Sequence, residues 1–184
     1  MFDQIREDYV VHGRSLRNRA LWAMGTYRFG VWSMHRRFGP WRWFTSKIYG
    51  LMKVFSEIVT GVSMDRKVRV GKRFHLIHAG MISIHPETVF GNDCGVMHNV
   101  TIGTNMGKGV PKIGNRVFIG AGACVLGDIR VQDGARIAAN SLVITDIPAD
   151  SVAIGVPAKV IPGIAGVVAS QKPQRTHPQA VPGS

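Results

Sequence analysis

Small apolar residues recur at every sixth position through the middle of the chain. One series runs through Ile84, Phe90, Val96 and Ile102, and a second through Ile113, Ile119, Val125, Val131, Ile137 and Val143. A helix repeats near 3.6 residues and a strand near 2, whereas a period of six is typical of a β-helix with short strands on each side of its stacked coils. The inward side chains of successive coils stack, so this spacing predicts one continuous core.

The same arithmetic predicts the number of coils. Three sides of six residues make a coil of eighteen, so about five coils fit between Val68 and Val160. The period slips once, because Ile102 and Ile113 are eleven residues apart, and the interval 104–111 is rich in turn formers. We expect a loop to leave the coil there and to form a wall or lid of a site.

Residues 1–60 are predicted to be helical. Apolar residues spaced by three and four positions form two stripes, one through Leu16, Ala20, Ala23, Tyr27, Val31 and Met34, the other through Ile48, Leu51, Met52, Phe55, Ile58 and Val59. Two amphipathic helices should therefore precede the repeats. We divide the chain into this segment, a β-helix domain over 61–161, and a flexible tail over 162–184, where proline is frequent.

The chain carries a net charge of +12, which is unevenly distributed. No acidic residue occurs between Tyr9 and Ser56, and all four tryptophans of the chain fall there among basic residues. Such a mixture is typical of a helix that contacts an anionic membrane surface. Nucleic acid is a less favoured partner, because no known nucleic-acid module is visible. The alternative is a helical cap whose aromatic residues pack on the β-helix or on a neighbouring subunit, and a cap is compatible with membrane contact.

The compartment is predicted from the N-terminus and the cysteines. The start, Met1-Phe2-Asp3-Gln4, has neither the basic residues nor the apolar core of a signal peptide. Cys94 and Cys124 stand at small-residue positions of the repeat, so we expect buried thiols rather than a disulfide or a metal site. We expect a cytoplasmic protein, with a peripheral position at the inner membrane face as a further expectation.

Histidines are the strongest chemical lead. Four of the seven, His75, His78, His85 and His98, fall in the first coils, just before the loop. At each position a solvent-exposed or core histidine is the structural alternative to a catalytic one. The spacing does not suggest zinc, and we expect no metal.

Several motifs in register resemble the serine acetyltransferase family of hexapeptide-repeat acyltransferases. They are His75-Leu-Ile-His78-Ala-Gly-Met-Ile, Val100-Thr-Ile-Gly103, Pro111-Lys-Ile-Gly114, Ile119-Gly-Ala-Gly-Ala123, Leu126-Gly-Asp128 and Gly155-Val-Pro-Ala-Lys159. The resemblance covers about residues 61–161. It implies a left-handed parallel β-helix assembled as homotrimers or dimers of trimers, with acetyl-CoA in a groove between neighbouring subunits.

The resemblance also implies roles for individual residues. His78 matches the catalytic histidine, a general base that accepts the proton of an acceptor hydroxyl. Thr104, Ala121 and Ala139 fall where the family's backbone contacts the pantetheine arm of CoA. Arg136 and Lys159 fall near where basic side chains meet its nucleotide phosphates, although solvated surface charge is an alternative role for both.

Two departures from the family concern the groups around His78. Ile77 stands where the family has an aspartate before the histidine, and Ser63 stands where a second aspartate orients its ring. Asp65, two residues further on, is a candidate replacement for that partner.

Other departures concern the acceptor. Gly109 and Val110 replace an Arg-His pair, so the chain lacks family groups for a free amino acid. We therefore expect the acceptor to be a sugar or polysaccharide-precursor hydroxyl that contacts His85, His98 and Asn99. Serine O-acetylation is the alternative activity, and a non-catalytic β-helix scaffold is a second alternative.

Overall fold

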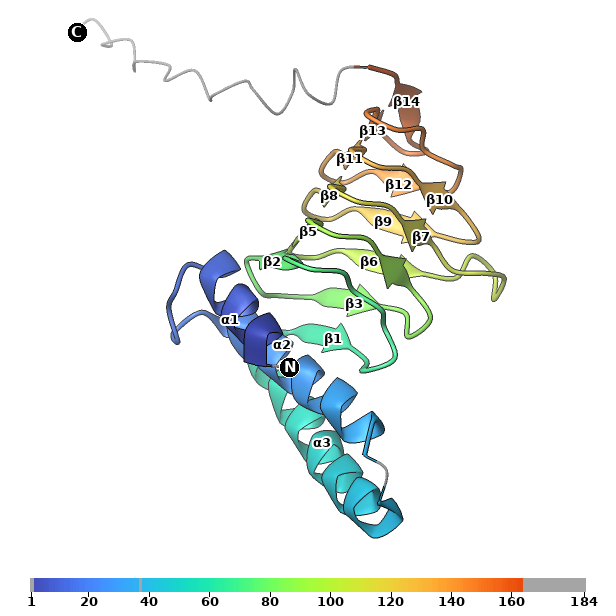
Figure 1. Cartoon of the computed structure of the whole chain (residues 1–184). Helices are drawn as coiled ribbons and strands as arrows, with labels where there is room; N and C mark the ends of the chain where they lie inside the picture. Colours follow the sequence, from blue (N-terminus) through green and yellow to red (C-terminus); the bar gives the residue numbers. More distant parts are fainter. Residues whose placement is uncertain (1, 37, 164–184) are drawn as a thin grey trace, which may run out of the picture.

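The computed structural model describes residues 2–36 and 38–163. It is a three-sided parallel β-solenoid of about five coils that follows three helices (Figure 1), so the predicted β-helix with a helical N-terminal segment is confirmed. Sheet A contains β1 (Val62–Met64), β3 (Ile82–Ile84), β6 (Thr101–Gly103), β9 (Cys124–Leu126) and β12 (Leu142–Val143). Sheet B contains β4 (Val89–Phe90), β7 (Lys112–Ile113) and β10 (Arg130–Val131). Sheet C contains β2 (His75–Ile77), β5 (Gly95–Met97), β8 (Phe118–Ile119), β11 (Arg136–Ile137), β13 (Val152–Ile154) and β14 (Lys159–Ile161).

Strand pairing confirms the eighteen-residue coil in the middle of the solenoid. Ile84 pairs with Ile102, and Ile119 pairs with Ile137, each eighteen positions along the chain. The loop 104–111 separates β6 from β7, so that Ile102 pairs with Val125 across a longer interval. The last strand departs from the pattern, because β14 runs antiparallel to β13.

The core lies inside the coils. Val96, Ile119 and Ile137 are fully buried, and they stack in successive strands of sheet C. Backbone approach is close at the corners: a Cβ on Gly91 would lie 2.7 Å from the backbone carbonyl carbon of Gly114. Glycine is therefore required at this position of the repeat. Cys94 is buried as predicted, whereas Cys124 is only half-buried.

Three helices, rather than two, precede the solenoid: α1 (Phe2–Val11), α2 (Arg19–Met34) and α3 (Gly39–Thr60). Helices α2 and α3 form a hairpin that projects from the β1 end of the solenoid (Figure 1). Asp8 of α1 and Arg28 of α2 form a buried ion pair at 2.8 Å, which ties the first helix to the hairpin. Tyr27 of α2 donates a hydrogen bond to the Val68 carbonyl at the first coil.

The two predicted apolar stripes have different outcomes. On α2, Ala20, Ala23 and Tyr27 are buried, although Leu16 is exposed and precedes the helix. Most of the stripe predicted on α3 is exposed, although Met52, Phe55 and Val59 line a hollow shared with α2. The buried positions of that helix are instead Thr45, Tyr49, Ser56 and Thr60. The proline-rich tail lies outside the described residues from 164 onward.

Candidate functional site

The corner between sheets C and A brings four predicted residues into one column, which we call the histidine corner. It consists of His78, His98, Ala121 and Ala139, each two positions after an inward-facing residue of sheet C. Hydrogen bonds join neighbouring coils here, from the Gly122 N–H to the His98 carbonyl (3.1 Å) and from the Asn140 N–H to the Ala121 carbonyl (2.8 Å). The rings of His78 and His98 meet edge to face, with centroids 6.2 Å apart.

Backbone geometry fixes the start of this column. His78 has a φ of 60°, a left-handed conformation that is uncommon outside glycine, whereas in later coils Asn99, Gly122 and Asn140 adopt it one position further on, directly after the column residue. The His78 side chain is exposed, so its ring can meet a ligand outside the solenoid. Above the two histidines the column continues as alanine, which leaves the backbone of the corner accessible.

A polar groove follows the outer face of sheet A. Its lining includes Lys53 from α3, outward hydroxyl residues, and residues at the start of the loop, namely Ser63, Asp65, Ser83, His85, Thr101, Gly103, Thr104 and Leu126. Asp65 and His85 lie in adjacent coils at the far edge of sheet A, because Met64 pairs with Ile84. His78 precedes β3 and therefore stands at the opposite edge.

Asp65 is already engaged by other groups. Its carboxylate accepts hydrogen bonds from the Lys53 ammonium (3.2 Å) and the Lys67 N–H (2.9 Å). Burial alone would raise the pKa of Asp65, but these hydrogen bonds lower it below its ordinary value. Within the described residues, no hydrogen bond joins Asp65 to His78. The role of Asp65 as the partner of His78 stays a prediction.

Two charged residues of α3 were missed by the sequence analysis. Ser63 Oγ donates a hydrogen bond to Glu57 Oε1 at 2.8 Å, and Lys53 Nζ lies 3.8 Å from the same oxygen. A carboxylate therefore sits beside Ser63, the position where the family resemblance places an aspartate. The i, i+4 spacing of Lys53 and Glu57 could have signalled a charged helix face, but not its contact with β1.

His75 has a structural environment distinct from that of His78. Its ring packs edge to face against His12 of α1, with centroids 5.0 Å apart. His12 is buried, and its Nε2 accepts from the Leu76 N–H at 3.2 Å, so the imidazole is neutral with its proton on Nδ1, donated to the Asp8 carbonyl. Burial lowers the pKa of both histidines. This pair holds α1 against the first coils.

The remaining predicted residues are dispersed around these two features. Thr104 opens the loop at the groove, while His98 and Asn99 are exposed at the histidine corner. Arg136 lies on the outer face of sheet C, with its guanidinium 4.6 Å from the ring centroid of Phe118. Lys159 is exposed on β14.

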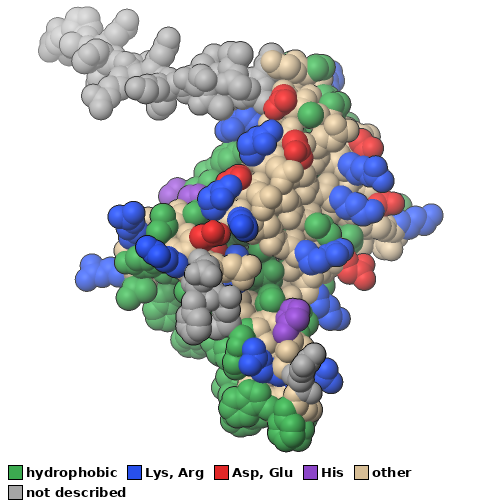
Figure 2. Space-filling model, in the orientation of Figure 1, with side chains coloured by type: hydrophobic (Ala, Val, Ile, Leu, Met, Phe, Trp, Pro, Cys, Tyr) green, Lys and Arg blue, Asp and Glu red, His purple; other side chains and the backbone are tan. Residues whose placement is uncertain are grey.

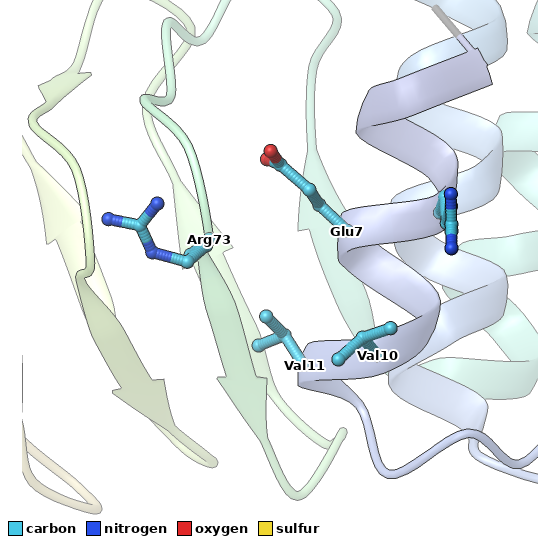
Figure 3. A pocket seen from close by; sticks show the side chains of 5 residues that line it. Glu7, Val10, Val11 and Arg73 are labelled. Atoms are coloured by element: carbon cyan, nitrogen blue, oxygen red, sulfur yellow. The ribbon is translucent and has the colours of Figure 1, made fainter.

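A second hollow lies between α1 and the first coils (Figure 3). Glu7 and Arg73 approach it from opposite walls, and Val10 and Val11 complete it together with Arg6. It contains none of the residues predicted to be functional. Among residues 2–36 and 38–163, no group of three or more His, Cys, Asp or Glu side chains is placed to hold a metal ion.

Comparison with known proteins relates the chain to acyltransferases. Residues 111–145 match the family model "Bacterial transferase hexapeptide (six repeats)". The serine acetyltransferase of Helicobacter pylori is 36% identical over 121 residues, which cover 62% of this chain and 71% of that protein. The serine acetyltransferase of Mycobacterium tuberculosis is 39% identical over 110 residues, covering 58% of this chain. The chain spans about half of the latter protein, since the match covers 48% of its length.

A solved structure agrees with these sequence matches. The serine acetyltransferase of Brucella abortus in complex with coenzyme A superimposes with a TM-score of 0.74 at 25% identity. The match covers 87% of this chain and 67% of that one, so the likeness includes helices as well as coils.

Proposed function

Since this chain belongs to the serine acetyltransferase family, we propose that it is an acetyl-CoA-dependent O-acetyltransferase. The observation that carries the proposal is the histidine corner, where an exposed imidazole stands at the foot of a column of small residues. Acetyl-CoA would lie along Ala121 and Ala139, with its thioester beside His78. Trimers, or dimers of trimers, are the assembly we propose, with a neighbouring subunit closing the groove.

The chemistry is a direct transfer. Neutral His78 accepts the proton of the acceptor hydroxyl while its oxygen attacks the thioester carbonyl carbon. The C–S bond then breaks, and the protonated imidazole returns its proton to the CoA sulfur, giving an acetyl ester and free CoA. The oxyanion formed between these steps requires a hydrogen-bond donor, for which backbone N–H groups of the corner are our candidates.

For the acceptor we propose L-serine, in place of the sugar hydroxyl that the sequence analysis favoured. The named relatives are all serine acetyltransferases. Charged groups that suit a free amino acid are also present at two positions that the sequence analysis did not consider, because Lys53 and Glu57 bring both charges beside Ser63 in the sheet A groove. An ammonium and a carboxylate of the substrate could pair with these groups.

The acceptor is tested by initial rates of CoA release from acetyl-CoA with L-serine and with a panel of sugars. Saturable turnover of L-serine, with sugars close to the rate of hydrolysis, would support the proposal. Preferential acetylation of a sugar would restore the expectation drawn from Gly109 and Val110.

Binding of CoA distinguishes an acetyltransferase from a non-catalytic scaffold. Isothermal calorimetry with CoA should show saturable binding to the wild-type protein, which a scaffold does not require. If CoA gave no heat of binding while the protein remained folded, the enzymatic proposal would fail together with the assignment of the column.

A further inference from the structure

Helix α3 carries its polar side inward and its apolar side outward. Its outward stripe follows helical spacing through Trp43, Lys47, Leu51, Val54 and Ile58. Trp43, Leu51 and Ile58 are 65%, 76% and 79% exposed, respectively. A helix of a globular protein normally buries such a stripe against its core. This one is turned away from α2 and the solenoid, so it needs another apolar environment.

We call the exposed apolar side chains of this helix the apolar face of α3. They are Trp41, Trp43, Phe44, Ile48, Leu51, Met52, Val54, Phe55 and Ile58, of which Met52 and Phe55 also border a hollow shared with Trp22 of α2. Figure 2 shows hydrophobic side chains gathered over the projecting end of the hairpin, with basic side chains beside them. A continuous patch of this kind marks an interaction site.

The charges around this face select its partner. Between Tyr9 and Ser56 the sequence has no acidic residue, so the cations of the hairpin end have no carboxylate nearby in the chain. Arg36 lies 4.2 Å from the ring centroid of Trp32, and Lys47 lies 5.8 Å from that of Trp43. A second copy docked on this face would add the same excess of basic residues and, between Tyr9 and Ser56, no acidic residue to neutralise them. Lipid phosphates, in contrast, would pair with these cations.

We propose that the apolar face of α3 lies on an anionic lipid bilayer, with the helix in the plane of the headgroups. The helix has 22 residues, which corresponds to a length of roughly 33 Å. Its apolar side chains would enter the acyl boundary while Arg36 and Lys47 remain among the phosphates. No helix in the described part of the chain is long and apolar enough to cross a membrane. The proposed attachment is peripheral and lies on the cytoplasmic side, where anionic lipids attract basic segments.

The four tryptophans provide a built-in reporter, because all of them lie between residues 22 and 43 on the hairpin. The full-length protein is mixed with phosphatidylcholine vesicles that contain or lack phosphatidylglycerol. Binding to the anionic vesicles should shift tryptophan emission to shorter wavelength, and brominated acyl chains should quench it. Raising the salt concentration should weaken the attachment.

Substitutions on α3 separate the apolar and the charged contributions to vesicle binding. The double variant Leu51→Ser, Ile58→Ser should raise the lipid concentration for half-maximal binding by about tenfold or more. Lys47→Gln should raise it by about fivefold on anionic vesicles and have little effect on neutral ones. The matched controls are Val10→Ser on α1 and Lys112→Gln on sheet B, both exposed positions away from this face.

The molar mass measured by light scattering distinguishes attachment to lipid from association with a second copy of the chain. The proposal requires the double variant to lose vesicle binding while its circular dichroism spectrum and molar mass stay those of the wild type. If the double variant instead changed molar mass and bound vesicles as the wild type does, the face would be a contact between copies and the proposal would be wrong. Absence of vesicle binding by the wild type would overturn it as well.

Discussion

The solenoid and the α2–α3 hairpin orient their apolar residues in opposite ways. In the solenoid, each short strand turns its apolar residues inward, and residues such as Val96 and Ile137 become fully buried within one chain. In the hairpin, α3 turns Thr45 and Ser56 inward and leaves Leu51 and Ile58 exposed. The solenoid therefore buries its apolar residues within one chain, whereas the hairpin leaves an apolar face uncovered. The two regions should also separate in function, with chemistry in the first and attachment in the second.

The largest effect on activity is expected when a histidine of the solenoid is substituted, and a histidine of the hairpin provides the control. His78→Ala should lower acetyl transfer by about 10²–10⁴-fold, because the proposed general base is lost, while CoA binding is retained. His35→Ala, at the exposed C-terminal end of α2, should leave transfer unchanged. Rates and CoA affinity measured on both variants test the pair. Wild-type activity in His78→Ala would remove the mechanism.

Two isoleucines test the difference in burial. Ile119 is fully buried in the solenoid, so Ile119→Ala should reduce the free energy of unfolding by about 2–5 kcal/mol. Ile58→Ala should change it by less than about 0.5 kcal/mol, because Ile58 is exposed. Denaturant unfolding in the absence of lipid provides both values. Similar losses in the two variants would mean that the face of α3 is covered in solution.

A bulky residue in the alanine column should weaken cofactor binding without unfolding the solenoid. Ala139 is exposed, so Ala139→Trp has room outward but obstructs the proposed path of the pantetheine arm. We expect the Kd for CoA to rise by roughly tenfold, equivalent to about 1.4 kcal/mol. Ala149→Trp, at another exposed position of the solenoid, is the control. An unchanged Kd in Ala139→Trp would place CoA elsewhere.

The smallest effect concerns the junction between the helices and the coils. Burial lowers the pKa of His12 below its ordinary value of 6.5, so the unfolded chain takes up a proton first as the pH falls. Stability should therefore decline from about pH 6.5 downward, until the pH reaches the lowered pKa of the folded state. His12→Gln should flatten this part of the Tm profile. His75 faces His12 and also has a lowered pKa, so it should account for any pH dependence of Tm that remains in His12→Gln.

The sequence was most informative where local repetition determines structure. The six-residue period predicted the coils, and the strand pairing agrees with an eighteen-residue coil, in which Ala121 and Ala139 stack one coil apart. In a solenoid, residues one coil apart are neighbours, so spacing along the chain translates directly into contact.

Contacts between different elements were not predictable in this way. The apolar stripe of α3 was recognised, but its direction depends on how Tyr49 packs on Gly30, where a Cβ would collide with the tyrosine ring. Likewise, the sequence around Ser63 does not indicate its hydrogen bond to Glu57. That contact depends on the direction in which the chain leaves α3 at Gly61 and enters β1. The rotation of a helix about its axis is set by tertiary packing, which a single periodicity does not encode.

The position of CoA on the solenoid tests the central claim most directly. A crystal structure of the wild-type protein with CoA should show the pantetheine arm along Ala121 and Ala139, with the sulfur next to the imidazole of His78. If the sulfur lay instead beside Asp65 and His85, at the other edge of sheet A, then His78 could not act on the thioester and the account would be contradicted.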